Sequence, residues 1–220
     1  DMRCLLFTLL ALLQVAGFAL FAQSVSSKLT GTPPNNEIWY TSTDGKVIEP
    51  FIYVENGEEC IPFDAKVVSN TYANGKGVIK FEGPLAVIKS NAFISRFRLT
   101  ELVMPNSVTS IERGAFYGCV NLSSINLSDN LNSIGDMALC SCIALTELEV
   151  PESVEFIGNQ AFLDCMRLRS ITLPKSVTEF GSGVLHRCGL LTSLILPNGV
   201  EEIGGDYFYG LTSLTTLVIP

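Results

Sequence analysis

The chain has 220 residues, of which 47% are hydrophobic, and it carries a formal net charge of -8 at pH 7. This acidic balance argues against a nucleic-acid partner, because binding to phosphates depends on clustered Lys and Arg side chains. The same lack of cations disfavours docking on an anionic membrane. The length allows one sizeable domain, or one domain with a small additional unit.

The N-terminal segment has the layout of a secretory signal peptide. Arg3 precedes an uncharged apolar run from Leu5 to Phe21, and Ala22 supplies a small residue before Gln23. We therefore expect residues 1–22 to be a signal peptide cleaved after Ala22. An uncleaved membrane anchor is the alternative, although the run is near the lower limit for spanning a bilayer. Cleavage predicts a secreted or cell-surface protein that is not inserted in a membrane.

The region of residues 23–75 predicts a small β-rich unit. Three reversal signals separate its β-prone runs: Asp44-Gly45, Asn56-Gly57 and Asn74-Gly75. We interpret this region as an N-terminal cap that covers the open apolar end of the repeats that follow. The alternative is that Trp39 and Tyr40 form a platform on which sugar rings stack.

Residues 76–220 contain a repeat of 23 residues, with six full copies and a truncated seventh. The clearest copy is "LTELEVPESVEFIGNQAFLDCMR", from Leu145 to Arg167, and we number its positions from the leading leucine. Positions four, six and thirteen are apolar in successive copies, and position seven is often proline. No insertion or deletion breaks the register. The leading leucines are Leu99, Leu122, Leu145, Leu168, Leu191 and Leu214.

Each copy predicts two short extended segments and one turn of helix. Alternating apolar residues at positions four and six predict a strand, and the following proline ends it. Val154 and Ile157 predict the second extended segment. Ala161, Cys165 and Leu168 have the spacing of one side of a short helix. We expect positive φ at Gly135, Gly158, Gly181 and Gly204. Helix N-caps are expected at Ser90, Asp136, Asn159 and Ser182.

One such unit cannot enclose a core, so the units must stack. The predicted fold is of the α/β class: a right-handed leucine-rich-repeat solenoid with a parallel β-sheet and short helical turns, preceded by the small β-rich cap. Because residues 214–220 repeat only the first strand of a unit, we expect the sequence to be part of a longer protein.

The repeat resembles that of BspA-like leucine-rich-repeat surface proteins of Bacteroides-type bacteria and their treponemal relatives. At position nine the asparagine of commoner leucine-rich repeats is mostly absent, since the chain has Ser107, Asn130, Ser153, Ser176 and Gly199. The resemblance implies adhesion, with host matrix proteins such as fibronectin or fibrinogen as ligands. The residues that carry it are Leu145, Leu148, Pro151, Ser153, Val154, Ile157, Gly158, Ala161, Phe162, Cys165 and Leu168.

Four cysteines share position twenty-one: Cys119, Cys142, Cys165 and Cys188. In an exported protein an even set suggests disulfides. A bridge needs Cα atoms within about 7 Å, and we expect neighbouring units to be farther apart on the helical side. We therefore predict buried, unbridged thiols that pack as small hydrophobic groups. Cys60 lies alone in the cap region.

The remaining candidates for chemistry are few. His186 is the single histidine, so a Ser-His-Asp or Cys-His mechanism would need it, but its position in the repeat is variable. Cys140 and Cys142 lack the partners of a zinc site. We predict no catalytic residue, no metal and no cofactor, and hence no enzyme. The alternative is the repeat region of a larger enzyme whose catalytic domain is absent.

The candidate binding surface is the strand face that points away from the core. Positions three and five alternate with the buried positions four and six, and we expect them to form a shallow ribbon with exposed apolar spots at Val103, Ile195 and Val218. We predict that this ribbon binds a protein. A glycan is the alternative ligand. A second alternative is that the ribbon is a solvent-exposed surface that binds no ligand. The selected residues are Glu101, Val103, Glu147, Glu149, Thr172 and Ile195.

Overall fold

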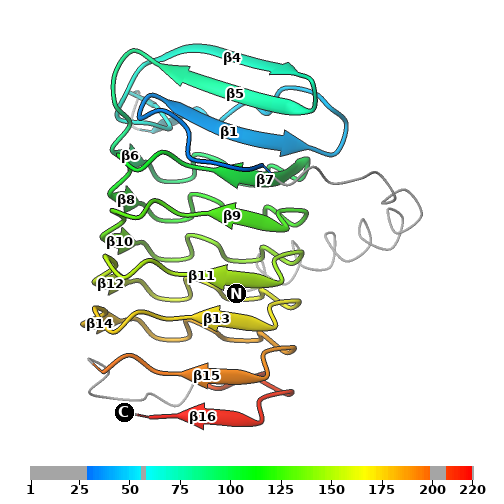
Figure 1. Cartoon of the computed structure of the whole chain (residues 1–220), viewed down its shortest axis with the longest axis vertical. Helices are drawn as coiled ribbons and strands as arrows, with labels where there is room; N and C mark the ends of the chain where they lie inside the picture. Colours follow the sequence, from blue (N-terminus) through cyan, green and yellow to red (C-terminus); the bar gives the residue numbers. More distant parts are fainter. Residues whose placement is uncertain (1–28, 56–57, 199–206, 220) are drawn as a thin grey trace.

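The computed structural model describes residues 29–55, 58–198 and 207–219. It shows a stack of coils below an antiparallel cap (Figure 1). The predicted signal peptide lies outside the described residues, as do Gly199, Ile203 and Gly204 of the repeat pattern.

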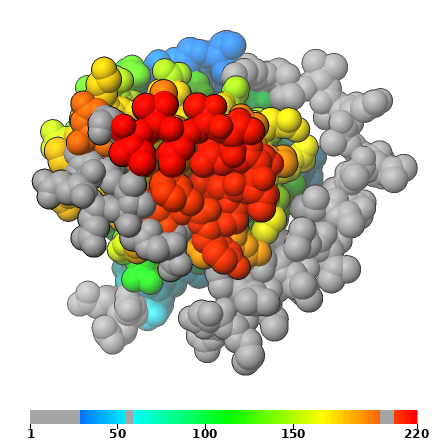
Figure 2. Space-filling model, turned by 90° about the horizontal axis from the view of Figure 1, so that it is seen from below, coloured from blue at the N-terminus to red at the C-terminus, as the bar shows by residue number. Residues whose placement is uncertain are grey.

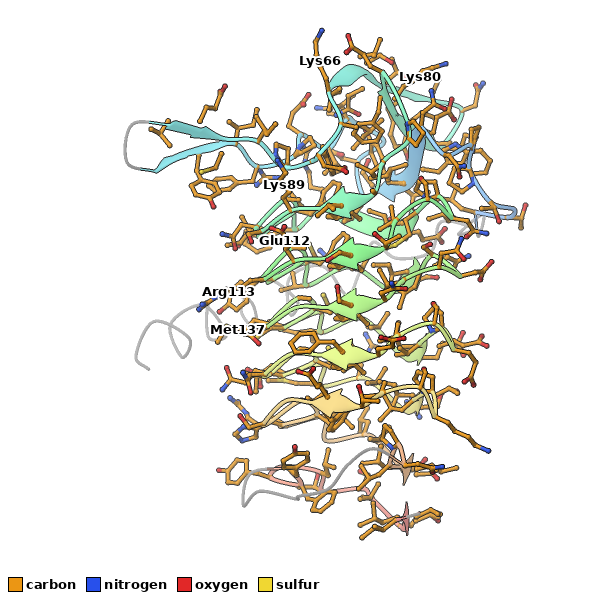
Figure 3. The ribbon with its side chains drawn as sticks, turned by 90° about the vertical axis from the view of Figure 1, so that its left-hand side faces the viewer. Lys66, Lys80, Lys89, Glu112, Arg113 and Met137 are labelled. Atoms are coloured by element: carbon orange, nitrogen blue, oxygen red, sulfur yellow. The ribbon has the colours of Figure 1, made fainter. Side chains whose placement is uncertain are left out.

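The cap is built from antiparallel strands. β1 (Glu37–Ser42) and β4 (Val67–Ala73) both pair with β5 (Lys76–Phe81). Asn74 and Gly75 both have positive φ between β4 and β5, as the two-residue hairpin signal predicts. β2 (Tyr53–Glu55) and β3 (Glu58–Cys60) form a separate hairpin that projects sideways (Figure 3).

The cap is continuous with the first coil. β1 pairs antiparallel with β7 (Leu99–Val103), and so covers the edge that the first parallel strand would otherwise expose. Tyr40 of β1 is fully buried and its ring lies over Gly77, its partner in β5. The proposed sugar platform at Trp39 and Tyr40 is therefore wrong for Tyr40, because this ring fills the cap interior.

Parallel strand pairs join neighbouring coils, and residues 23 apart lie opposite each other. The strands of the second extended segment form one five-stranded sheet: β6 (Val87–Ile88), β8 (Ser110–Ile111), β10 (Ser133–Ile134), β12 (Phe156–Ile157) and β14 (Glu179–Phe180). The first strands lie in one row (Figure 1): β7, β9 (Ser124–Asn126), β11 (Glu147–Glu149), β13 (Ser170–Thr172), β15 (Ser193–Ile195) and β16 (Thr216–Val218). The pairs of the first strands are β7–β9, β11–β13 and β15–β16, in three separate sheets.

The predicted helical turns are wrong for the described residues, which contain no helix. In this part of each coil, alternate backbone N–H groups donate to carbonyls of the next coil. The N–H of Gln160 donates to Ser182 at 2.9 Å and that of Phe162 to Val184 at 2.9 Å. A helix would use the same donors for its own i-4 carbonyls. Accordingly, none of these residues belongs to a helix that could cross a membrane.

Left-handed residues recur in these turns at positions sixteen and twenty. Gln160 has φ 56° and Asp164 has φ 61°. This conformation reverses the direction of every second peptide group, which lets the turn bond to its neighbouring coil. The other residues that share it are Asn91, Ser95, Gly114, Gly118, Met137, Ser141, Gly183, Arg187 and Gly210.

The glycines at position fourteen allow the backbones of neighbouring coils to pack closely. The prediction of positive φ is wrong for Gly135, Gly158 and Gly181. A Cβ atom on Gly158 would lie 2.5 Å from the backbone nitrogen of Asp136, and one on Gly135 would lie 2.8 Å from that of Arg113. Side chains at such distances overlap the preceding coil. Glycine is therefore required because the two backbones touch.

The residues predicted as helix N-caps bridge neighbouring coils instead. Asp136 Oδ1 accepts the backbone N–H of Asn159 at 2.7 Å, and Asn159 Oδ1 accepts that of Ser182 at 2.9 Å. At the first coil, the backbone N–H and hydroxyl of Ser90 donate to Glu112. Position nine bridges coils as well, since the Ser153 hydroxyl donates to the Leu131 carbonyl at 2.8 Å.

The four position-twenty-one cysteines are buried and free, as predicted. The spacing argument behind that prediction is wrong, because hydrogen bonds join neighbouring coils on this side. Each thiol donates to a carbonyl of the preceding coil. The Sγ–O distance is 3.3 Å from Cys165 to Leu139, and 3.0 Å from Cys119 to Phe93.

The last described coil ends the stack with exposed apolar residues. Figure 2 looks onto this end, where the residues of β16 lie across the earlier coils. Leu217 is 39% exposed and Ile219 is 59% exposed. Their equivalents Leu148 and Val150 are buried, because the next coil covers them.

Candidate functional site

The chemical candidates of the sequence do not form an activated group. The His186 ring packs edge-on against Tyr209, with 4.5 Å between ring centroids. Burial raises the pKa of the Cys188 thiol to about 12, which makes it a poor nucleophile at neutral pH. Within the described part of the chain, no three His, Cys, Asp or Glu residues are grouped as metal ligands.

A buried carboxyl lies on the turn side. The Asp164 side chain is buried, and Arg187 Nε lies 3.1 Å from Oδ1. Among described residues, however, Oδ1 accepts no hydrogen bond. Burial raises the pKa of the Asp164 carboxyl, opposed by the charges of Arg187 and His186. The carboxyl therefore binds a proton more tightly in the folded protein than in the unfolded chain.

We expect Asp164→Asn to stabilise the protein at neutral pH. A raised pKa gives stability that is complete below the carboxyl's unfolded pKa and is lost as the pH rises through the folded pKa. The amide mimics the protonated group, and asparagine tolerates positive φ. Thermal unfolding should show a higher midpoint for the variant at pH 7, and a difference that vanishes in acid. Glu155→Gln, at an exposed carboxylate, is the control. A less stable Asp164→Asn protein at pH 7 would contradict this expectation.

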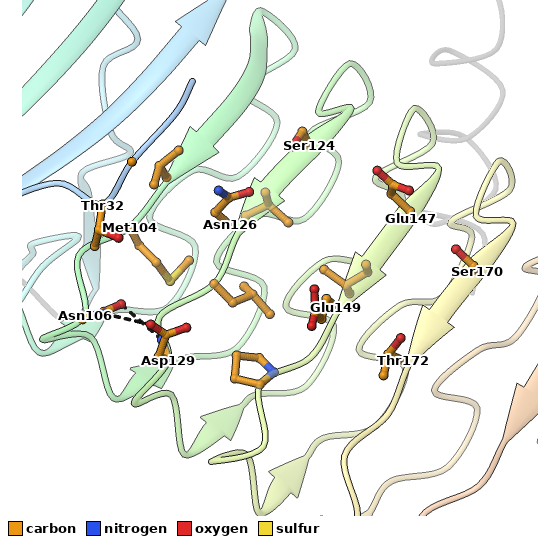
Figure 4. Close-up of a pocket in the computed structure, with 16 residues that line it drawn as sticks. Thr32, Met104, Asn106, Ser124, Asn126, Asp129, Glu147, Glu149, Ser170 and Thr172 are labelled. Carbon is orange, nitrogen blue, oxygen red and sulfur yellow. Dashed lines mark hydrogen bonds between the residues drawn. The ribbon is translucent and has the colours of Figure 1, made fainter. Parts of the chain in front are cut away.

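The described chain has a groove of about 530 Å³ on the outward face of the first-strand row (Figure 4). It crosses β7, β9, β11 and β13. Met104, Ile125 and Leu148 also line it, but their side chains are buried and belong to the hydrophobic core behind the strands. Most of the remaining lining residues are polar or acidic: Asn106, Ser124, Asn126, Asp129, Glu147, Glu149, Ser170 and Thr172.

Four of the six residues selected from the sequence line the groove: Val103, Glu147, Glu149 and Thr172. Glu147 and Glu149 are exposed and flank Leu148 on β11, with Ser170 and Thr172 as their partners in β13. Ile195 lies on β15 outside the groove lining and is 59% exposed, as expected for an apolar surface position.

Glu101 and Val103 are buried, which corrects the expectation that both belong to an open ribbon. Glu101 is 6% exposed and Val103 is 4% exposed. Residues 29–35, which we call the strap, lie against the same coils. The Leu29 N–H donates to Glu101 Oε2 at 3.0 Å, and the Ser107 hydroxyl donates to the Asn35 carbonyl at 2.9 Å. Gly31 and Thr32 of the strap line one end of the groove.

Sequence reasoning missed an amide–carboxylate pair in the groove. Asn106 Nδ2 donates to Asp129 Oδ2 at 2.9 Å, and the Asp129 N–H donates to Asn106 Oδ1 at 3.2 Å. Both residues occupy position eight, directly after the strand-ending position. Because residues at the same position of neighbouring repeats lie side by side, the shared position could have predicted this pair. The strap carried no such signal, because it has no counterpart in the repeats.

The groove is negatively charged. In the part of the chain that the structure describes, its lining contains the carboxylates of Asp129, Glu147 and Glu149 and no Lys or Arg. Among the described residues, none of these three carboxylates is in an ion pair. Such an acidic surface is complementary to a partner that carries cationic side chains.

Comparison with known proteins identifies the repeat. Residues 86–220 match a family model described as a BspA type leucine rich repeat region, in 6 copies. A leucine-rich repeat protein of T. pallidum, TpLRR, is similar with 34% sequence identity and a TM-score of 0.61, over 63% of this chain and 65% of that protein. A leucine-rich repeat protein of Bacteroides ovatus shares the fold, with 24% identity and a TM-score of 0.51, over 80% of this chain and 52% of that one. No significant match is found among curated proteins. The chain thus spans less than two thirds of either solved structure.

Proposed function

The chain belongs to the BspA-type leucine-rich repeat family, and from this premise we propose that it is a non-enzymatic recognition module that binds a protein through the groove. The observation that carries the proposal is the set of exposed carboxylates along the groove, which form no ion pair with any described residue. Affinity then comes from complementary contact with a surface that is already in place.

The scaffold favours such binding because it is rigid. Strand pairing joins β7 to β9 and β11 to β13 within the groove. The β10–β12 pair and the turn hydrogen bonds join the coils between these two pairs. A preorganised surface loses little conformational entropy when it binds. The groove also crosses four coils, so its exposed residues come from separate repeats.

We further propose that the protein acts outside the cell, secreted or at the cell surface. The support is the signal-like order of residues 1–22, with Arg3 before an uncharged apolar run. The resemblance to BspA-like proteins then suggests host matrix proteins, with fibronectin and fibrinogen as the first ligands to test.

The test is binding of the purified chain to immobilised fibronectin and fibrinogen, measured by surface plasmon resonance. We expect Glu147→Lys with Glu149→Lys to weaken binding by about tenfold or more, because repulsion replaces attraction in the groove. The matched control is Glu155→Lys with Glu179→Lys, which changes the net charge equally on exposed residues outside the groove lining. Equal losses in both variants would contradict a role for the groove.

A glycan ligand is the competing outcome of the same experiment. Tyr40 is buried, and Lys76 Nζ lies 3.8 Å from the centre of a Trp39 ring, so only part of the suggested platform is accessible. If the chain bound a polysaccharide and no matrix protein, and if Trp39→Ala abolished that binding, the protein-recognition proposal would fail.

A further inference from the structure

The strap provides an internal example of how a chain segment binds this face. It lies beside β7 at the end of the groove (Figure 4). Its Leu29 N–H donates to the carboxylate of Glu101, a position-three residue, at 3.0 Å. This face therefore already holds a peptide backbone by a charge-assisted hydrogen bond.

We propose that the groove binds an extended polypeptide segment with cationic side chains, which lies along β11 as the strap lies along β7. This inference rests on the proposed protein-binding function and specifies its partner. The segment would place a backbone N–H on Glu147 and a Lys or Arg side chain beside Glu149.

Glu147 is the open counterpart of Glu101. Both residues occupy position three, and two strand spacings separate them, which is roughly 10 Å. Glu101 is covered by the strap, whereas Glu147 is exposed. Within the described residues no hydrogen bond or ion pair involves the Glu147 or Glu149 side chain. Their acceptor atoms are therefore free for a second segment.

The spacing of the carboxylates fits an extended chain. Glu147 and Glu149 are two residues apart on the same strand face, which corresponds to roughly 7 Å. Alternate residues of an extended peptide have the same spacing. In a helix, residues two apart do not face the same side. Ser170 and Thr172 repeat this spacing on β13 and offer hydroxyl groups.

The negative charge of the groove favours cationic side chains on the bound segment. Asp129 adds a third carboxylate at the same groove, and no cationic side chain of the described ranges lines it. Arg is well suited to this pattern because its guanidinium donates two parallel hydrogen bonds to a carboxylate.

The probe is a fluorescent dodecapeptide of alternating arginine and threonine, with binding followed by fluorescence anisotropy in about 150 mM salt. We expect this peptide to bind, and its glutamate–threonine analogue not to bind. Two further analogues carry N-methyl groups on the arginine or on the threonine backbone nitrogens. We expect at least one of them to bind about tenfold more weakly, because a charge-assisted hydrogen bond is lost.

The protein variants separate a specific site from general attraction. Glu147→Gln keeps the shape of the side chain, and we expect it to weaken binding of the arginine–threonine peptide by about tenfold. Glu155→Gln removes one exposed charge elsewhere and should leave the affinity unchanged. Equal binding by all N-methylated analogues, or equal losses in the two variants, would overturn the inference in favour of non-specific attraction.

The experiment also distinguishes this inference from the proposed function. If the groove variant Glu147→Lys with Glu149→Lys loses matrix-protein binding while no peptide binds, the proposed function stands and the extended segment is wrong. If the peptide binds through Glu147 but neither matrix protein binds, the extended segment is supported and these two matrix ligands are wrong.

Discussion

Gly158→Ala is expected to lower the free energy of unfolding by about 3 kcal/mol, at the upper end of the cost of overpacking a core. The added Cβ would lie 2.5 Å from the backbone nitrogen of Asp136 and 2.7 Å from the carbonyl carbon of Gly135. Neither atom can rotate away as a side chain does. Two coils must separate, which weakens the ladders on both sides of the contact.

Thermal and urea unfolding followed by circular dichroism measure this effect, and the thermal midpoint should fall by roughly 10 °C. Gly83→Ala is the matched control, because a Cβ there meets no atom within 4 Å and the φ is not positive. It should change stability by less than about 1 kcal/mol. A Gly158→Ala protein as stable as Gly83→Ala would show that the coils are not in the close contact described.

Cys60 is expected to react with a maleimide at least about a thousandfold faster than the buried cysteines of the native protein. Burial raises the pKa of Cys119 and Cys188 to about 12 from the usual 9.0, which lowers the reactive thiolate fraction by roughly three decades. Burial also raises the pKa of Cys142 and Cys165 well above the usual value. Cys60 is only partly buried.

Mass spectrometry of timed labelling reactions gives the rates residue by residue. Cys4, which lies outside the described residues, is replaced by serine in all samples. Cys60→Ser should remove the fast reaction, and denaturant should make every thiol reactive. Rapid labelling of Cys165 in the native protein, or a disulfide between two position-twenty-one cysteines, would disprove the buried arrangement.

The periodic part of the fold was predictable, because the same residue types recur at fixed positions. Leu148 and Ile157 are buried where the alternation and the 23-residue period place them, and Cys165 is buried and free. The turn conformation was not predictable in the same way. Ala161 and Cys165 have helical spacing, but hydrogen bonds to the next coil decide the backbone, and such non-local bonds leave no mark in the spacing of one unit.

The candidate site was predictable where it depends on the repeat alone. Glu147, Glu149 and Thr172 line the groove because positions three and five point away from the core. Glu101 has the same position but is buried by the strap. No periodic rule could place that non-repeating segment, and this explains why one acid in the row is covered and another is open.

The alternating hydrogen bonds of the turns limit which insertions and deletions the repeats tolerate. An extra residue in one turn would redirect the next N–H from the neighbouring coil to its own coil and move the left-handed residues out of line. The shift would disturb the coils above and below, because the turn is hydrogen-bonded to both of them. Gain or loss of single residues is therefore costly here, whereas gain or loss of a whole unit keeps the backbone hydrogen bonds of the turns in register. Such a scaffold changes its reach in steps of one coil, and residues 76–220 keep their period without interruption.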